Sequence, residues 1–226
     1  MALLRIILID QLTAKISSLS DIDAARDTIL LSEVAFDTNS VRPHKKKIAF
    51  IYSAMRHFAI ELKNEGYKVR YTKVNDPENT ETLRGDIEQA IFEVNPQKIV
   101  VTEPSEYWLL QEMNGWQSAF GIPVEIRTDE RFFYSHQAFA EWAHGRKHLR
   151  MEHFYREVRR KYGILMDGTN PEGGKWNYDS ENRKQPHEDL KFPQTFKAEP
   201  DAISKEVIEL VTKKFSDNFG DIEPFY

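Results

Sequence analysis

The chain has 226 residues, of which 40% are hydrophobic and 30% charged, a balance typical of a soluble protein with a buried core. It has no cysteine, which excludes disulfides, thiol catalysis and cysteine-ligated zinc or iron-sulfur sites within these residues. No stretch approaches the ~18 uncharged apolar residues of a membrane span, and no signal-peptide pattern opens the chain, so the expected location is the cytoplasm. The net charge of -5 argues against nucleic-acid binding through overall charge, but it allows a local basic face.

Five short aliphatic or β-branched runs predict strands, at residues 3–9, 28–34, 68–74, 98–102 and 124–127. Helical periodicity occupies residues 44–62, 79–94 and 109–120. Strands that alternate with helices are what a parallel sheet requires. We therefore predict an α/β domain over residues 1–133, with a Rossmann-like five-stranded parallel sheet and flanking helices.

The alternation fails after Thr128. Residues 136–143 and 152–162 are helical in pattern with no strand between them, and residues 163–200 are rich in Gly, Pro, Asn and charge. A segment this long is a linker or a functional loop. We expect a helical connector with a long interdomain loop over residues 134–200, and a final amphipathic helix in the segment 201–226.

The first helix begins with three lysines, Lys45, Lys46 and Lys47, where the helix dipole favours acidic residues. An anionic ligand, an acidic neighbouring segment or a nucleic acid would each supply the missing charge. The alternative is that these side chains extend into water at little cost.

Polar residues follow the first two predicted strands. Asp10 and Gln11 end the first, and Ser32 and Glu33 lie near the end of the second. Open α/β sheets bind ligands beyond the carboxyl ends of their strands, so these groups and the apolar stripe of the first helix could line a pocket for a flat ring with polar edges. Alternatively, Asp10 caps a turn and Glu33 pairs with a lysine of residues 45–47. Nucleotide-binding glycine motifs, metal-ligand histidine spacings and a Ser/His/Asp arrangement are not recognisable.

A second cluster lies in residues 145–163, where arginines and lysines outnumber carboxylates and alternate with aromatic side chains. The adjoining loop of residues 173–184 adds Trp176, Tyr178 and Arg183. Basic and aromatic groups together suit phosphate backbones and base stacking, which favours nucleic-acid contact. A solvated helix face is the alternative interpretation.

Several segments resemble one family closely. They are ILIDQL, HKKKIAFIYSAMRHFA, VTEPSEY, RFFYSH, GRKHLRMEHFYREVRRKYGILMDG, PEGGKWNYDSENRK and DNFG, spread from Leu3 to about Phe219. The chain resembles the N-terminal half of the prokaryotic iron-sulfur photolyase and cryptochrome family, the deoxyribodipyrimidine photolyase-related proteins, whose members include bacterial (6-4) photolyases.

The resemblance implies an antenna domain and connector of a light-dependent DNA repair photolyase of the (6-4) type. Family members repair damaged DNA by electron transfer from reduced FAD, held with a 4Fe-4S cluster in a C-terminal helical domain. Residues 201–226 would lead into that FAD domain, which lies outside this chain, so the chain alone would lack repair activity. Damaged DNA and the FAD domain are the implied partners. A cryptochrome-type blue-light receptor of the same family and a free-standing α/β protein that binds flavin or lumazine are the alternatives.

The resemblance also implies site residues, although no catalytic residue and no metal ligand. The antenna chromophore would be 6,7-dimethyl-8-ribityllumazine, and its pocket would involve Ile9, Asp10, Glu33, Val34, Lys47, Ile48 and Ile51. Ile9 is a departure, because relatives commonly have Gly there. The residues that would approach DNA are Lys147, Arg150, Arg159, Arg160, Trp176, Asp179 and Arg183. Asp179 is the one expected to influence a divalent ion.

Overall fold

The computed structural model describes residues 2–34, 42–194 and 196–225. It divides into two compact units, one of residues 1–131 with 197–226 and one of residues 132–196. The predicted boundary at 133 lies two residues from the observed one. Residues 201–226, for which we predict a helix leading into an FAD domain, belong to the first unit. Within the described ranges, no helix is long and apolar enough to cross a membrane.

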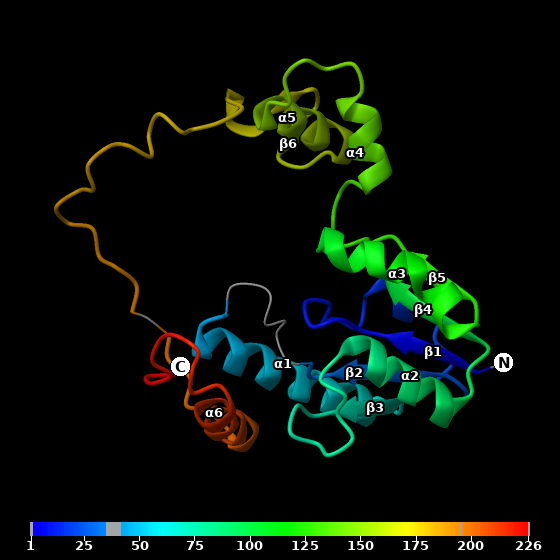
Figure 1. Cartoon of the computed structure of the whole chain (residues 1–226). Coiled ribbons are helices and arrows are strands. Elements are labelled where there is room, and N and C mark those ends of the chain that lie inside the picture. The colour runs from blue at the N-terminus through cyan, green and yellow to red at the C-terminus, as the bar shows by residue number, and fades with distance from the viewer. Residues whose placement is uncertain (1, 35–41, 195, 226) are drawn as a thin grey trace. The chain divides into compact units, whose positions relative to one another are not determined.

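The first unit is built on a five-stranded sheet in the order β3-β2-β1-β4-β5 (Figure 1). All neighbouring strands are parallel, which confirms the predicted Rossmann-like α/β fold. The first three strands end two to three residues before the sequence prediction. The strands are β1 (Leu3–Ile6), β2 (Thr28–Ser32), β3 (Lys68–Thr72), β4 (Lys98–Thr102) and β5 (Val124–Arg127).

Alternating side chains divide the core between the two faces of the sheet. On one face Leu4, Ile6 and Leu30 pack with α2 (Leu83–Val94) and α3 (Tyr107–Phe120). On the other face Ile29 and Leu31 pack with the C-terminal half of α1 (Lys45–Asn64) and with the short 3-10 helix η1 (Ser17–Leu19). Strands buried on both faces read as nearly continuous apolar runs, which is why they were recognisable in the sequence.

The helix α6 (Ala202–Lys214) returns to the first unit and packs on α1. Val207 and Val211 are fully buried against Ile48, Tyr52 and Met55. This third hydrophobic cluster therefore joins two segments that lie far apart in the sequence.

The second unit contains α4 (His136–Ala143) and α5 (Met151–Tyr162), as the sequence predicted. The strands β6 (Met166–Asp167) and β7 (Asn170–Pro171) form a small antiparallel hairpin, followed by the 3-10 turn η2 (Glu172–Gly174). From Lys175 to Phe196 the described residues are turns and irregular backbone, in agreement with the expected long loop.

A buried ion pair links β1 to the segment that precedes β2. Arg5 is 1% exposed and Asp27 is 2% exposed, and Arg5 Nε lies 2.7 Å from Asp27 Oδ2. Arg5 Nη1 also donates to the Ser18 carbonyl at 2.6 Å. The charge of Arg5 is therefore tolerated inside the domain only because its donors are satisfied.

We predict that Asp27→Ala lowers the free energy of unfolding by about 3 kcal/mol, because it removes the buried carboxylate that pairs with Arg5 and leaves the exposed Asp21, at 2.7 Å, as the counter-ion. Urea denaturation followed by circular dichroism measures the loss. The control is Glu88→Ala, which breaks the exposed Arg84–Glu88 pair and costs about 0.5 kcal/mol or less. Equal losses in the two variants would contradict the structural role of the Arg5–Asp27 pair.

Candidate functional site

Glu33 is the most highly connected of the predicted pocket residues, and it is fully buried. Its carboxylate accepts hydrogen bonds from Arg56 Nε at 2.6 Å, Arg56 Nη2 at 3.0 Å and Tyr71 Oη at 2.6 Å. The backbone N–H of Val74 donates to it at 2.9 Å. The sequence alternative that paired Glu33 with a lysine of residues 45–47 is thus wrong, since its partner is Arg56 two to three turns further along α1.

Burial and the charge of Glu33 act together on the pKa values of its neighbours. Burial raises the pKa of Tyr71, and the charge and hydrogen bond of Glu33 raise it further, so the hydroxyl stays protonated and acts as a donor. Burial alone would lower the pKa of Arg56, but the hydrogen bond and charge of Glu33 outweigh it and raise that pKa. The group is therefore a stable charged network.

The apolar pocket residues lie at the third hydrophobic cluster. Ile48 is fully buried in it, and Ile9 and Ile51 pack against it while half-buried. Lys47 is exposed in the first turn of α1. Val34 is half-buried, and its carbonyl accepts a hydrogen bond from Tyr52 Oη at 3.0 Å. These residues thus lie around the N-terminal half of α1. Ile48 packs inside the core beneath them and has no exposed surface.

Asp10 stands in the loop after β1 and is 44% exposed. Ser105 Oγ donates to Asp10 Oδ2 at 2.8 Å, and Arg131 Nη1 donates to the Asp10 carbonyl. The adjacent Gln11 is buried, and its amide Nε2 donates to the Glu103 carbonyl at 3.1 Å. Asp10 therefore has a structural role in its loop while its carboxylate keeps surface for a ligand.

The first N–H groups of α1 are capped by the His44 side chain and by a backbone carbonyl. The Nδ1 atom of His44 accepts from the Lys46 N–H at 3.0 Å, and the Phe219 carbonyl accepts from the Lys45 N–H at 3.2 Å. The Phe219 ring meets the His44 ring edge-on, with centroids 5.2 Å apart. The segment after α6 therefore caps this helix, and none of the three lysines is part of the capping through its side chain.

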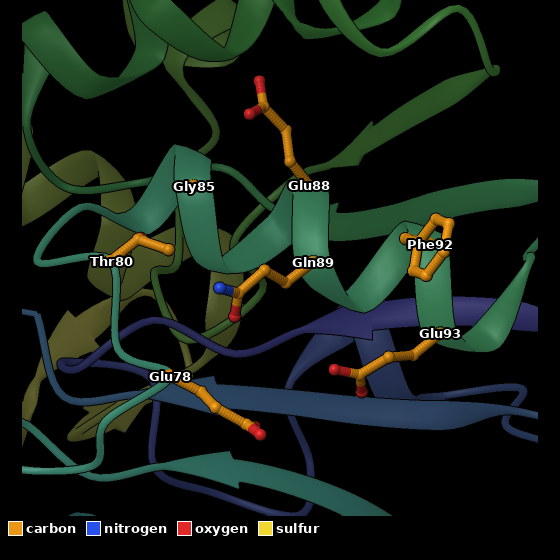
Figure 2. A pocket seen from close by; sticks show the side chains of 7 residues that line it. All are labelled: Glu78, Thr80, Gly85, Glu88, Gln89, Phe92 and Glu93. Atoms are coloured by element: carbon orange, nitrogen blue, oxygen red, sulfur yellow. The ribbon is translucent and has the colours of Figure 1, made fainter.

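A surface hollow of about 540 Å³ lies beside α2 and contains none of the predicted site residues (Figure 2). Three carboxylates and the exposed Phe92 dominate its lining. Glu93 is paired with Arg70 at 2.7 Å, and Glu88 is paired with Arg84 at 3.1 Å. The described lining contains no lysine or arginine, so it offers phosphates no opposite charge. Its lining residues are Glu78, Thr80, Gly85, Glu88, Gln89, Phe92 and Glu93.

Some cations of the second unit are already paired or buried, whereas others are exposed. Arg146 is paired with Glu157 at 3.1 Å and Arg156 is paired with Glu152. Arg159 is 5% exposed and donates to backbone carbonyls, so direct DNA contact by this side chain stays a prediction that its burial does not favour. The sequence could not separate these residues, because pairing and burial depend on which way each helix face turns.

The remaining predicted DNA residues are accessible, with Trp176 half-buried. In the described parts of the chain, no carboxylate forms an ion pair with the four exposed cations. The Arg160 guanidinium lies 4.5 Å from the Trp176 ring centroid. Asp179 is exposed, and the described residues contain no group of three potential metal ligands around it. The exposed cations are Lys147, Arg150, Arg160 and Arg183.

An exposed contact that the sequence did not reveal holds the start of α6 on α1. His57 Nε2 lies 2.6 Å from Asp201 Oδ2, and His57 Nδ1 lies 2.7 Å from the Ser53 carbonyl. Only a protonated imidazole donates from both nitrogens, so the Ser53 carbonyl and Asp201 raise the pKa of His57. The Ser204 N–H and then His57 lower the pKa of Asp201 to about 2.

We predict that this contact makes the stability of the first unit pH-dependent. Because folding raises the pKa of His57, the stabilisation is complete below about pH 6.5 and is lost as the pH rises through the folded pKa. The urea midpoint should therefore fall more between pH 5.5 and pH 8.5 in the unmodified chain than in His57→Gln. Lys63→Gln, at an exposed position in the last turn of α1, is the control and should keep the unmodified pH profile. Identical profiles for His57→Gln and the unmodified chain would exclude this role of His57.

Comparison with known proteins covers the whole chain. Residues 5–226 match the family described as deoxyribodipyrimidine photo-lyase-related protein. The chain is 51% identical over 225 residues to a (6-4) photolyase of Agrobacterium fabrum, a match that covers 100% of this chain and 44% of that protein. The chain thus spans less than half the length of this relative.

A more distant similarity is to the uncharacterized protein R852 of Acanthamoeba polyphaga mimivirus. The two are 22% identical over 143 residues, which is 61% of this chain and 70% of the viral protein. The family match and the 51% identity agree with the Rossmann-like sheet and with the basic, aromatic second unit. The chain belongs to the deoxyribodipyrimidine photolyase-related protein family.

Proposed function

We propose that this chain is the antenna and DNA-contacting part of a light-dependent photolyase that repairs (6-4) lesions. The observation that carries the proposal is the high identity to a (6-4) photolyase over the full length of the chain. The same similarity favours repair over a blue-light receptor or a free-standing flavin or lumazine carrier. The cytoplasm is the location that this proposal implies.

The first unit would hold 6,7-dimethyl-8-ribityllumazine, a group that absorbs light and passes the energy on. The chemistry of the residues fits a flat ring with polar edges. Ile9 and Ile51 offer half-buried apolar surface, and the exposed carboxylate of Asp10 and ammonium of Lys47 suit ring-edge and ribityl polar groups. Glu33 and Ile48 would support the pocket from behind, because neither has exposed surface.

The second unit would bind the DNA backbone through its exposed cations. Lys147, Arg150, Arg160 and Arg183 meet no competing carboxylate in the described residues, so phosphates can pair with them. Trp176 offers an aromatic ring for stacking. Asp179, close to Arg183 in the sequence, would be the position at which a divalent ion affects this contact.

Flavin chemistry would lie outside these 226 residues. FAD and a 4Fe-4S cluster would be held by a C-terminal domain, the further partner of this chain. The lack of cysteine in the chain supports this division, since cluster irons need thiolate ligands. We expect the purified chain to show no flavin absorbance and no light-dependent repair by itself.

We predict that the chain binds 6,7-dimethyl-8-ribityllumazine at micromolar concentration, measured by equilibrium dialysis and by the change in lumazine fluorescence. Ile51→Trp should weaken binding about tenfold by overfilling the apolar wall. Phe50→Trp is the matched control, since Phe50 is the neighbouring residue on α1 and is 67% exposed. Absence of binding by the unmodified chain would refute the chromophore proposal.

We predict that Lys147→Ala and Arg150→Ala each lower the slope of log K against log salt by about 1, because each removes one phosphate contact. Fluorescence anisotropy with a duplex that carries a (6-4) lesion measures the slope. Arg84→Ala on α2 of the first unit removes the same charge beside an acidic hollow and should leave the slope unchanged. An unchanged slope in both variants would contradict phosphate contact and favour the alternative interpretation, in which these side chains only face solvent.

A further inference from the structure

Arg159 is the one arginine of α5 that is buried. All three nitrogens of its guanidinium donate hydrogen bonds. Its Nε donates to the Ile164 carbonyl at 3.0 Å, and its Nη2 donates to the Leu165 carbonyl. Its Nη1 donates to Tyr155 Oη at 3.1 Å. A planar fork that binds successive backbone carbonyls fixes the direction of the chain as it leaves the helix.

The segment that Arg159 holds is conformationally demanding. Gly163 ends α5 in the left-handed conformation with φ 65°, and Leu165 is also left-handed, with φ 52°. A non-glycine residue keeps such a backbone only when its surroundings impose it. The Leu165 carbonyl is bound twice, by Arg159 and by the Glu172 N–H at 2.9 Å. The turn and the β6–β7 hairpin are thereby locked together.

The same guanidinium positions Trp176. Arg159 Nη1 lies 3.5 Å from the Trp176 carbonyl, and Arg159 Cζ lies 5.3 Å from the centroid of the indole ring. The guanidinium carbons of Arg156 and Arg160 lie 5.4 Å and 4.5 Å from that centroid. Three cations around one ring form a cation–π cluster. Of the three, Arg159 also donates to backbone carbonyls of the turn after α5 and to the carbonyl of Trp176 itself.

We propose that Arg159 is a positioning residue of the nucleic-acid surface: it holds the turn after α5 and the Trp176 ring in place, while the exposed cations contact phosphates. This inference rests on the proposed DNA contact of the second unit, and it assigns to Arg159 a role that needs its fork geometry as well as its charge. Lysine has the charge without the fork, so the two roles are separable by substitution.

The experiment compares Arg159→Lys with Arg156→Lys, two variants that keep the charge of α5 and that both change a guanidinium near the Trp176 ring. In Arg159→Lys we expect acrylamide to quench Trp176 more strongly, measured as the difference between each chain and its Trp176→Phe counterpart. Affinity for lesion-bearing DNA should fall about tenfold with an unchanged salt slope, because loss of the fork's charged hydrogen bonds disorders the surface without removing a charge. Arg156→Lys should stay close to the unmodified chain in both measurements, because Arg156 is paired with Glu152 and is not among the cations proposed to contact phosphates.

A third variant, Arg159→Met, separates positioning from phosphate contact. If Arg159→Lys binds DNA normally while Arg159→Met loses about 1 in salt slope, Arg159 contacts phosphate and the proposal is overturned. Amide hydrogen exchange supplies a readout that does not depend on DNA. Loss of protection confined to residues 163–178 in Arg159→Lys supports the proposal, whereas unchanged protection, or loss throughout residues 132–194, contradicts it. If no variant, nor the unmodified chain, binds DNA, the proposed function fails while quenching and exchange still decide the role of Arg159.

Discussion

The buried carboxylate of Glu33 is the group on which the organisation of the first unit depends. An unpaired charge inside a protein is too costly to persist, so the elements around Glu33 must converge on it. Arg56 comes from α1, Tyr71 from β3 and the Val74 N–H from the turn after β3. Arg56 Nη1 continues the network to Glu206 on α6 at 2.9 Å, and Lys73 Nζ reaches the same carboxylate oxygen at 2.8 Å. One polar network thus fixes both the sheet edge and the returning helix.

This network is compatible with a stable core and the proposed chromophore pocket lying on the same segments. The half-buried Ile9 and Ile51 form the apolar surface, and the fully buried Ile48 belongs to the cluster that α6 completes. Glu33, which the sequence suggested as a ligand-binding residue, is fully buried and supports this apolar surface from within. Lys47 and Asp10 keep the accessible charge. In the proposed pocket, ligand contact and core packing would therefore fall to different side chains along the same short segments.

The fold was largely predictable, because strands buried on both faces and amphipathic helices leave strong periodic signals. The boundaries of α4 and of β4 and β5 agree with the sequence prediction. The partners of charged side chains were not predictable. Arg56 and Glu206 are 150 residues apart, and nothing in the sequence indicates that α6 packs on α1. Similarly, Arg159 and Arg160 are adjacent, and only the rotation of α5 makes one buried and the other exposed.

The return of α6 has a consequence for how the protein is made. At the usual ~5–20 residues per second, a ribosome needs several seconds to synthesise the connector after the sheet is complete. During that time Ile48, Tyr52 and Met55 lack Val207 and Val211, their eventual neighbours. Packing α6 on α1 closes a long loop of chain, and this closure has an entropic cost that contacts between residues near in sequence do not have. The nascent sheet domain therefore passes through an interval with an uncovered apolar helix face, and chaperone demand should concentrate there.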